Sequence, residues 1–228
     1  MTDAATCIGI PANMPDADAA AVPETFLTAY DAIWLKGRMP DAGWCLVRAA
    51  TSGVGIAACQ LARALGVHAI ATSRSAGRAA ALAPFEPAGT IIEGEEDLAA
   101  RVRELTDKRG VDVVLDLVGG SGSGAAVDAL RTGGTLMLVG IMGGARSEFN
   151  LARILTGQLT VLGTTMRNRP LDQRRHLAAI FTDRVLPLLQ NGALRPVVDR
   201  VMPVTQVADA HRLIESNQHL GKIVLAWD

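Results

Sequence analysis

The sequence predicts an α/β protein built on a doubly wound parallel sheet of six strands, and three observations carry this prediction. Short apolar runs alternate with helical stretches between residues 44 and 166. Each run is separated from the next by a crossover long enough for a helix, which gives right-handed βαβ units. The composition is 49% hydrophobic but only 4% aromatic, which suits buried parallel strands under helices.

The elements of this sheet can be assigned in order along the chain. Strands are expected at 44–50, 67–73, 89–93, 111–120, 133–140 and 159–166. Helices are expected between them at 53–65, 75–83, 95–108, 124–132 and 151–156. Gly66 closes the first helix, and Pro84 stops the second because proline cannot continue it. The third helix begins with acidic and ends with basic residues, which matches the helix dipole.

Two flanking segments lie outside the predicted sheet. Ahead of it, 23–37 reads as a helix with Pro23 in its first turn. Behind it, helices at 171–190 and 204–216 alternate with strands at 197–202 and 222–227. These two strands have no sequential partner in the chain, so the sequence leaves their pairing open.

Composition excludes several classes of function. The net charge is −1 and charges of both signs are interspersed, so the composition does not indicate a surface that binds nucleic acid or a membrane. Three cysteines form no CxxC pair and four histidines lack metal-ligand spacing, so we expect a reduced cytoplasmic protein without a metal site. Packing or surface roles are expected for the histidines. The first residues lack the regions of a signal peptide, and no apolar run is long enough to span a bilayer.

The turn after the first strand is the main candidate for binding a dinucleotide. AATSGVG (49–55) joins a strand to a helix, where backbone N–H groups and the positive helix end favour a pyrophosphate. Against the pattern GxGxxG it reads Ala50-x-Ser52-x-x-Gly55, which keeps only the glycine needed for helix–strand approach. A tight turn without a ligand is the alternative, but its place after the first strand of a βα series favours a cofactor.

The end of the second strand favours NADPH over NADH. Sites that prefer NAD place an acid about 20 residues beyond the loop to hold the ribose 2′-hydroxyl. Here Arg74 stands at that place, followed by Ser75 and Arg78, with no acid before Glu86. Both arginines can pair with a 2′-phosphate and Ser75 can donate to it. The alternative is two arginines on a solvated helix start, which the helix dipole disfavours.

The chain resembles the medium-chain dehydrogenase/reductase superfamily, specifically its zinc-free quinone oxidoreductases related to zeta-crystallin. The resemblance is carried, in family order, by AAVPETFLTAYDAI, LVRAATSGVGIAACQLARALG, GVDVVLDLVGG, LMLVGIMGGA, LTVLGTTMRNRP and AHRLIESNQHLGKIVL. It implies a Rossmann fold and NADPH-dependent reduction of a quinone or other conjugated carbonyl. In that reaction the nicotinamide delivers hydride, and the protein supplies orientation and exclusion of water.

The resemblance also implies where the cofactor lies. Thr28 would lie against the nicotinamide, the loops after the fourth and fifth strands along its ribose and ring, and 165–166 at the carboxamide. Glu93 replaces a family tyrosine beside the adenosine ribose, where we expect a carboxylate to repel the phosphate. No catalytic residue is assigned. The implied cofactor-binding set is Thr28, Ser52, Gly53, Val54, Gly55, Arg74, Ser75, Arg78, Val118, Gly119, Gly140, Ile141, Met142, Thr165, Met166 and Asn217.

Family members begin with a GroES-like domain of about a hundred residues that forms the other wall of the cleft. The chain resembles the family only from the tail of that domain onward. We therefore expect a remnant of the catalytic-domain tail at 1–22, an NADPH-binding Rossmann domain at 23–166, and a segment at 167–228 that in relatives returns to the catalytic domain. The strands of that last segment would be unpaired edges unless they re-pair.

Two hypotheses of function remain open from the sequence. One is a quinone or enone reductase whose substrate wall is re-formed by a second subunit or by the C-terminal segment. The other is an NADPH-binding or dimerising module that has lost catalysis with the front domain. A homodimer through strand 159–166 is expected, because that apolar edge has unpaired backbone groups. Asp112 and Asp116, at i and i+4 on one strand face, could form an acid pair, although the resemblance makes Asp116 structural.

Overall fold

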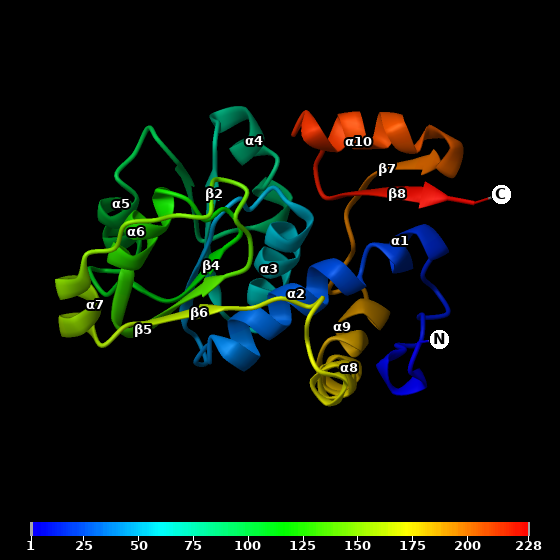
Figure 1. Ribbon diagram of the computed structural model, residues 1–228, viewed down its shortest axis with the longest axis horizontal. Coiled ribbons are helices and arrows are strands. Elements are labelled where there is room, and N and C mark those ends of the chain that lie inside the picture. The colour runs from blue at the N-terminus through cyan, green and yellow to red at the C-terminus, as the bar shows by residue number, and fades with distance from the viewer. Residues whose placement is uncertain (1, 228) are drawn as a thin grey trace.

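The computed structural model describes residues 2–227 as a six-stranded parallel sheet with helices on both faces, beside a two-stranded sheet (Figure 1). The strand order β3-β2-β1-β4-β5-β6 begins in the middle and winds outward both ways. This is the doubly wound α/β arrangement predicted from the sequence, which is thereby confirmed. The strands are β1 (Trp44–Val47), β2 (His68–Ser73), β3 (Gly89–Ile92), β4 (Val111–Asp116), β5 (Leu130–Leu138) and β6 (Thr160–Gly163).

The crossover helices stand close to where the sequence predicts them, but most are shorter. The end of the helix expected at 124–132 is wrong, because β5 already begins at Leu130. In α5, Asp97 accepts a hydrogen bond from the Ala100 N–H at 3.0 Å and so starts the helix later than expected. The chain leaves that helix through the left-handed residues Asp107 and Lys108, with φ of 49° and 67°. The crossover helices are α3 (Gly53–Ala64), α4 (Ala76–Ala80), α5 (Leu98–Leu105), α6 (Gly122–Asp128) and α7 (Leu151–Gly157).

Two apolar layers hold the sheet between its helices. Alternate residues of a strand face opposite sides, so Cys45 and Val47 pack under α3 while Leu46 packs toward α5 and α6. All three of these side chains are fully buried. The sheet is covered on both faces, as parallel sheets require.

The predicted helix at 23–37 is confirmed as a continuous helical segment from Pro23 to Lys36. Its middle, α2 (Thr28–Tyr30), is flanked by wider π-type turns at Pro23–Leu27 and Asp31–Lys36. Arg169, from beyond β6, donates to both carboxylate oxygens of Asp31, at 2.9 and 2.6 Å. Both side chains are about 5% exposed, so this buried ion pair fixes the helix to the end of the sheet.

The C-terminal part differs from the prediction in two respects. The single helix expected at 171–190 is divided at Val185 into α8 (Leu171–Arg184) and α9 (Leu186–Gln190), because Pro187 lacks the N–H that a continuous helix needs. The expectation that the last two strands lack a partner in the chain is wrong, since they pair with each other in parallel. With the intervening helix they form a βαβ unit beside the main sheet (Figure 1). Its elements are β7 (Val198–Pro203), α10 (Val207–Glu215) and β8 (Lys222–Ala226).

Every strand of the main sheet except β2 ends earlier than predicted, and for β4 and β6 a side-chain contact accounts for the early end. β4 stops at Asp116, whose carboxylate accepts the N–H groups of Val118 and Gly119 at 2.9 Å each and so turns the chain. β6 stops at Gly163 rather than at residue 166, because Thr164 bonds the Asp31 carboxylate and draws the chain toward the helix. Within residues 2–227, no helix has the length and apolar character needed to cross a bilayer.

Candidate functional site

The loop after β1 is a tight turn that closes onto α3. Ser52 caps the helix, its side-chain oxygen accepting the Gly55 N–H at 3.1 Å. A Cβ added at Gly55 would lie 2.6 Å from the Ala50 Cα, so only glycine lets the helix approach the strand this closely. This confirms the sequence-based interpretation that position 55 needs a glycine for the close approach of helix and strand. A Cβ at Gly53 would lie 2.9 Å from side-chain atoms of both Thr25 and Lys222, so the loop is enclosed by distant segments.

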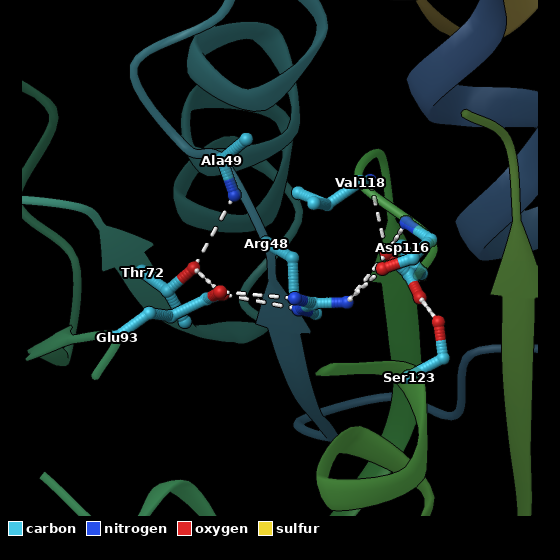
Figure 2. A network of polar contacts seen from close by, with 8 residues as sticks. Arg48, Ala49, Thr72, Glu93, Asp116, Val118 and Ser123 are labelled. Carbon is cyan, nitrogen blue, oxygen red and sulfur yellow. Dashed lines mark hydrogen bonds and ion pairs between the residues drawn. The ribbon is translucent and has the colours of Figure 1, made fainter. Parts of the chain in front are cut away.

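A buried ion network stands behind this loop, and the sequence reasoning missed its centre. Arg48 donates to the carboxylates of Glu93 and Asp116 at 2.9 Å each, with a side chain only 3% exposed (Figure 2). The Asp116 side chain is fully buried and the Glu93 side chain 23% exposed. An arginine inside the apolar run WCLVRAA is the signal that could have revealed it, because a buried charge must be paired.

This network joins the carboxyl ends of four strands. The Thr72 hydroxyl donates to Glu93 Oε1 at 2.6 Å and accepts the Ala49 N–H at 3.2 Å, while Ser123 donates to Asp116 Oδ2 (Figure 2). Burial raises the pKa of Glu93, but hydrogen bonds from Arg48 and Thr72 outweigh it and hold the pKa below its ordinary value. The carboxyl edge of the sheet is therefore a rigid platform.

The structure corrects two expectations about acidic residues. Glu93 was expected to repel a cofactor phosphate, but its charge is paired with Arg48, so the repulsion is reduced. The prediction that Asp112 and Asp116 could form an acid pair is wrong. The two residues lie at opposite ends of β4, about 13 Å apart at 3.3 Å per residue. Asp112 instead accepts from Arg109 at 2.7 Å and from the Trp44 N–H at 2.9 Å, at the far edge of the sheet.

The loops after β4 and β5 lie against each other, which brings together the residues predicted there. The Gly143 N–H donates to the Val118 carbonyl at 2.8 Å. Gly119 has a φ of +70°, and a Cβ there would lie 2.9 Å from the Gly140 carbonyl oxygen, so glycine is required. The side chains of Ile141 and Met142 extend outward and are 58% and 76% exposed.

The helix carrying Thr28 lies beside the segment that follows β6. Thr28 is 8% exposed and lies one turn before Asp31, whose carboxylate accepts the Thr164 hydroxyl at 3.2 Å. The predicted residues Thr165 and Met166 come directly after that contact, in a loop rather than in the strand. Segments far apart in the sequence are thus assembled at one edge of the sheet.

The residues predicted to hold a 2′-phosphate fall into two groups. Arg74 and Ser75 are exposed just beyond β2. Arg78 instead donates to Thr51 Oγ1 at 2.9 Å and to two main-chain carbonyls of the C-terminal segment, one of them that of Asn217. Asn217 has a φ of 55° and its side-chain amide donates to the Glu215 carbonyl, so it ends α10 and reaches the loop only through its main chain.

Two cavities open beside these loops. One, of about 570 Å³, lies between α5 and α6 and is bordered by Arg48, Glu93 and Gly94. The other, of about 960 Å³, is bordered by the loops after β4 and β5 and by Val161 of β6. Both volumes fall in the range of small-molecule sites. Across residues 2–227, no three His, Cys, Asp or Glu side chains are grouped as a metal ion would require.

Comparison with known proteins assigns the chain to a family. The sequence profile described as zinc-binding dehydrogenase matches residues 53–182. The human synaptic vesicle membrane protein VAT-1 homolog is 29% identical over 230 residues, which are 95% of this chain and 58% of that protein. The structure of Escherichia coli quinone oxidoreductase complexed with NADPH matches with a TM-score of 0.84 and 27% identity, covering 95% of this chain and 67% of that one.

A structure named as an NAD-dependent alcohol dehydrogenase matches with a TM-score of 0.80 and 32% identity, covering 94% of this chain and 60% of that one. The chain thus spans about three fifths of the length of the VAT-1 homolog and of this dehydrogenase. The family profile covers more than half of the chain, and the Rossmann-type sheet agrees with it. The chain therefore belongs to the zinc-binding dehydrogenase family, within the medium-chain dehydrogenase/reductase superfamily.

Proposed function

We propose that this chain binds NADPH along the carboxyl edge of its six-stranded sheet and serves the reduction of a quinone or another conjugated carbonyl. The observation that carries the proposal is the glycine-lined edge formed by the loops after β1, β4 and β5. At Gly53, Gly119 and Gly140 an added Cβ would meet neighbouring atoms at 2.9 Å or less. Packing thus requires glycine at these positions, and turns without side chains are the kind that a dinucleotide approaches closely.

The charges at this edge suit an anionic cofactor with a 2′-phosphate. The N-terminal turn of α3 offers N–H groups and the positive end of a helix to a pyrophosphate. Arg74 and Ser75 are exposed just beyond β2, where a site selective for NAD would carry an acid. We infer that these two residues bind the 2′-phosphate. Escherichia coli quinone oxidoreductase, whose structure is an NADPH complex, supports the same cofactor.

When bound, the nicotinamide supplies the hydride for the reduction. This chain's residues would hold and orient it: Val118 and Gly119 along the ribose, Gly140 beside the ring, Thr28 against the nicotinamide, and 165–166 at the carboxamide. The buried network around Arg48 would keep the strand ends fixed during this positioning. We propose that the reaction uses no zinc, that the protein acts in the cytoplasm, and that it forms a homodimer through β6.

One observation favours the alternative of a binding module without turnover. Ile141 and Met142, at the nicotinamide end of the proposed site, are 58% and 76% exposed. Hydride transfer needs water excluded from the reacting atoms, so a further wall would have to cover these side chains. A second subunit or another protein segment could supply that wall.

Calorimetric titration with NADPH and NADH tests binding, and loss of reduced-nicotinamide absorbance with an ortho-quinone, a para-quinone or an enone tests turnover. Binding and turnover together are the expected result. If NADPH binds but none of the three acceptors is reduced, the binding module is selected. If neither NADPH nor NADH binds, both functions are refuted.

A further inference from the structure

The residues that follow β6 form a small closed turn. The Thr164 N–H donates to the Leu138 carbonyl at 3.0 Å and so continues the pairing with β5. The Arg169 N–H donates to the Met166 carbonyl at 3.3 Å, and the Arg169 guanidinium donates to Thr164 Oγ1 at 2.8 Å. The first and the last residue of the segment 164–169 are therefore bonded to each other, which fixes the path of the chain between them.

The same side chains fasten this turn to the helical segment at 23–36. Arg169 donates to Asp31 Oδ1 at 2.9 Å and to Oδ2 at 2.6 Å, and the Thr164 hydroxyl donates to Oδ2 at 3.2 Å. Each of the three groups thus bonds the other two. The chain leaving β6 passes this helix before it enters α8 (Figure 1). The turn and the helix are therefore held at one separation and one angle.

The use of an ion pair for this contact indicates a need for orientation. The side chains of Asp31 and Arg169 are both almost fully buried. Taking two charges out of water is costly, and apolar side chains of similar volume often stabilise a fold equally well or better. An apolar contact, however, has no preferred direction. A guanidinium forked onto a carboxylate sets the direction as well as the distance.

The pair lies between the two elements that are proposed to hold the nicotinamide. Thr28 precedes Asp31 by one helical turn. Thr165 and Met166 lie within the turn that Arg169 closes, and both are more exposed than the pair. The pair can therefore act on a bound nicotinamide through these two elements, without touching the ring itself.

We propose that Asp31 and Arg169 are positioning residues that set the width of the nicotinamide site, by holding Thr28 and the segment 165–166 at a fixed separation. This inference rests on the proposed function for the identity of the cofactor. It gives the two ends of the site separate supports, since the network around Arg48 fixes the ends of β1, β2, β3 and β4. Breaking the pair should therefore weaken the hold on the nicotinamide and leave the adenosine end unchanged.

The test compares the affinities of the full chain for NADPH and for 2′-phospho-ADP-ribose, which is the cofactor without its nicotinamide. Their ratio measures what the nicotinamide contributes to binding, and the wild type should prefer NADPH. Arg169→Met keeps most of the side-chain length but removes the fork. It should bring the ratio to about one, because a misplaced wall loses its contacts, and leave the affinity for 2′-phospho-ADP-ribose unchanged. The matched control Arg175→Met removes a largely exposed ion pair between α8 and Asp3 and should keep the wild-type ratio.

Two milder variants keep the test decisive if Arg169→Met does not fold. Arg169→Lys keeps the charge but cannot fork onto both carboxylate oxygens, and Thr164→Val keeps the ion pair but removes the bridging hydroxyl. Both should lower the ratio in part. In a double-mutant cycle, Asp31→Asn combined with Arg169→Met should lower it little further than either change alone, because the two residues act as a unit. Additive losses would overturn this joint role.

The remaining outcomes separate the inference from the proposed function. If the folded variants keep the wild-type ratio, or lose both ligands equally, the pair has only a structural role and the inference is overturned while the proposed function stands. If the wild type binds the two ligands equally, there is no nicotinamide site to position, and the inference is overturned while cofactor binding stands. If the wild type binds neither ligand, the proposed function fails and the inference fails with it.

Discussion

Replacing Arg48 by methionine tests whether the buried ion network is a structural element of the sheet. Methionine keeps most of the side-chain length but leaves Asp116 and Glu93 without their cation. The Asp116 carboxylate would retain the N–H groups of Val118 and Gly119 and the Ser123 hydroxyl. Glu93 would retain the Thr72 hydroxyl and, at 23% exposure, some contact with water.

The size of the effect follows from these remaining contacts. Removing one member of a buried pair typically costs about 3–5 kcal/mol. We expect the lower end, about 3 kcal/mol, because Asp116 keeps three hydrogen bonds and Glu93 is partly solvated. Urea unfolding should show a lower midpoint with an unchanged slope, since the folded surface is the same. The control Arg63→Met removes an exposed ion pair with Glu86 and should change stability by less than about 1 kcal/mol.

The same network predicts a pH dependence. The pKa of Glu93 is lowered in the folded state, so its stabilising contribution is complete above its unfolded pKa of about 4.3. That contribution is lost as the pH falls from there through the folded pKa. In the Arg48→Met variant, the free energy of unfolding should therefore change less with pH over this acidic range. A variant within 1 kcal/mol of the wild type, or one with an unchanged acid profile, would refute the reasoning.

Four further outcomes are expected. Wild-type protein should bind NADPH about ten- to a hundred-fold more tightly than NADH, and Arg74→Ala should remove that difference in a calorimetric titration; equal wild-type affinities would contradict the assignment of the 2′-phosphate site. Elemental analysis should find no stoichiometric zinc, and chelators should leave any turnover unchanged. Val161→Pro should convert a dimer to a monomer in light scattering, whereas a folded but still dimeric variant would exclude β6 as the interface. Gly55→Ala should destabilise the protein by about 1–3 kcal/mol in urea, because the new Cβ would lie 2.6 Å from the Ala50 Cα; a stable variant would mean that the helix can shift.

The positions of the strands could be predicted because apolar periodicity and glycine turns act locally. All six strands of the main sheet and the helix at 23–36 stand where the sequence indicates. Not all of their ends could be predicted, because side chains distant in sequence set some of them. Thr164 leaves β6 to meet Asp31, 133 residues away. No local pattern reports such a contact.

The candidate site was predicted only in part for the same reason. The loop residues 52–55 and the glycines after β4 and β5 carry a recognisable local pattern. Arg48 carries only an indirect signal: a charge inside an apolar strand indicates that it must be paired but does not indicate its partner. Its role in the network depends on Glu93 and Asp116, which only the folded chain brings near.

The ion pair between Asp31 and Arg169 sets an order on the folding of the chain. Its members are 138 residues apart, and all six strands of the main sheet lie between them in the sequence. Closing so long a loop is costly in entropy until the intervening contacts have formed. Asp31 can therefore meet Arg169 only after β6 is in place, whereas the packing of its helix against α3 does not depend on that strand. Mutations at Asp31 should therefore speed unfolding while leaving the folding rate nearly unchanged.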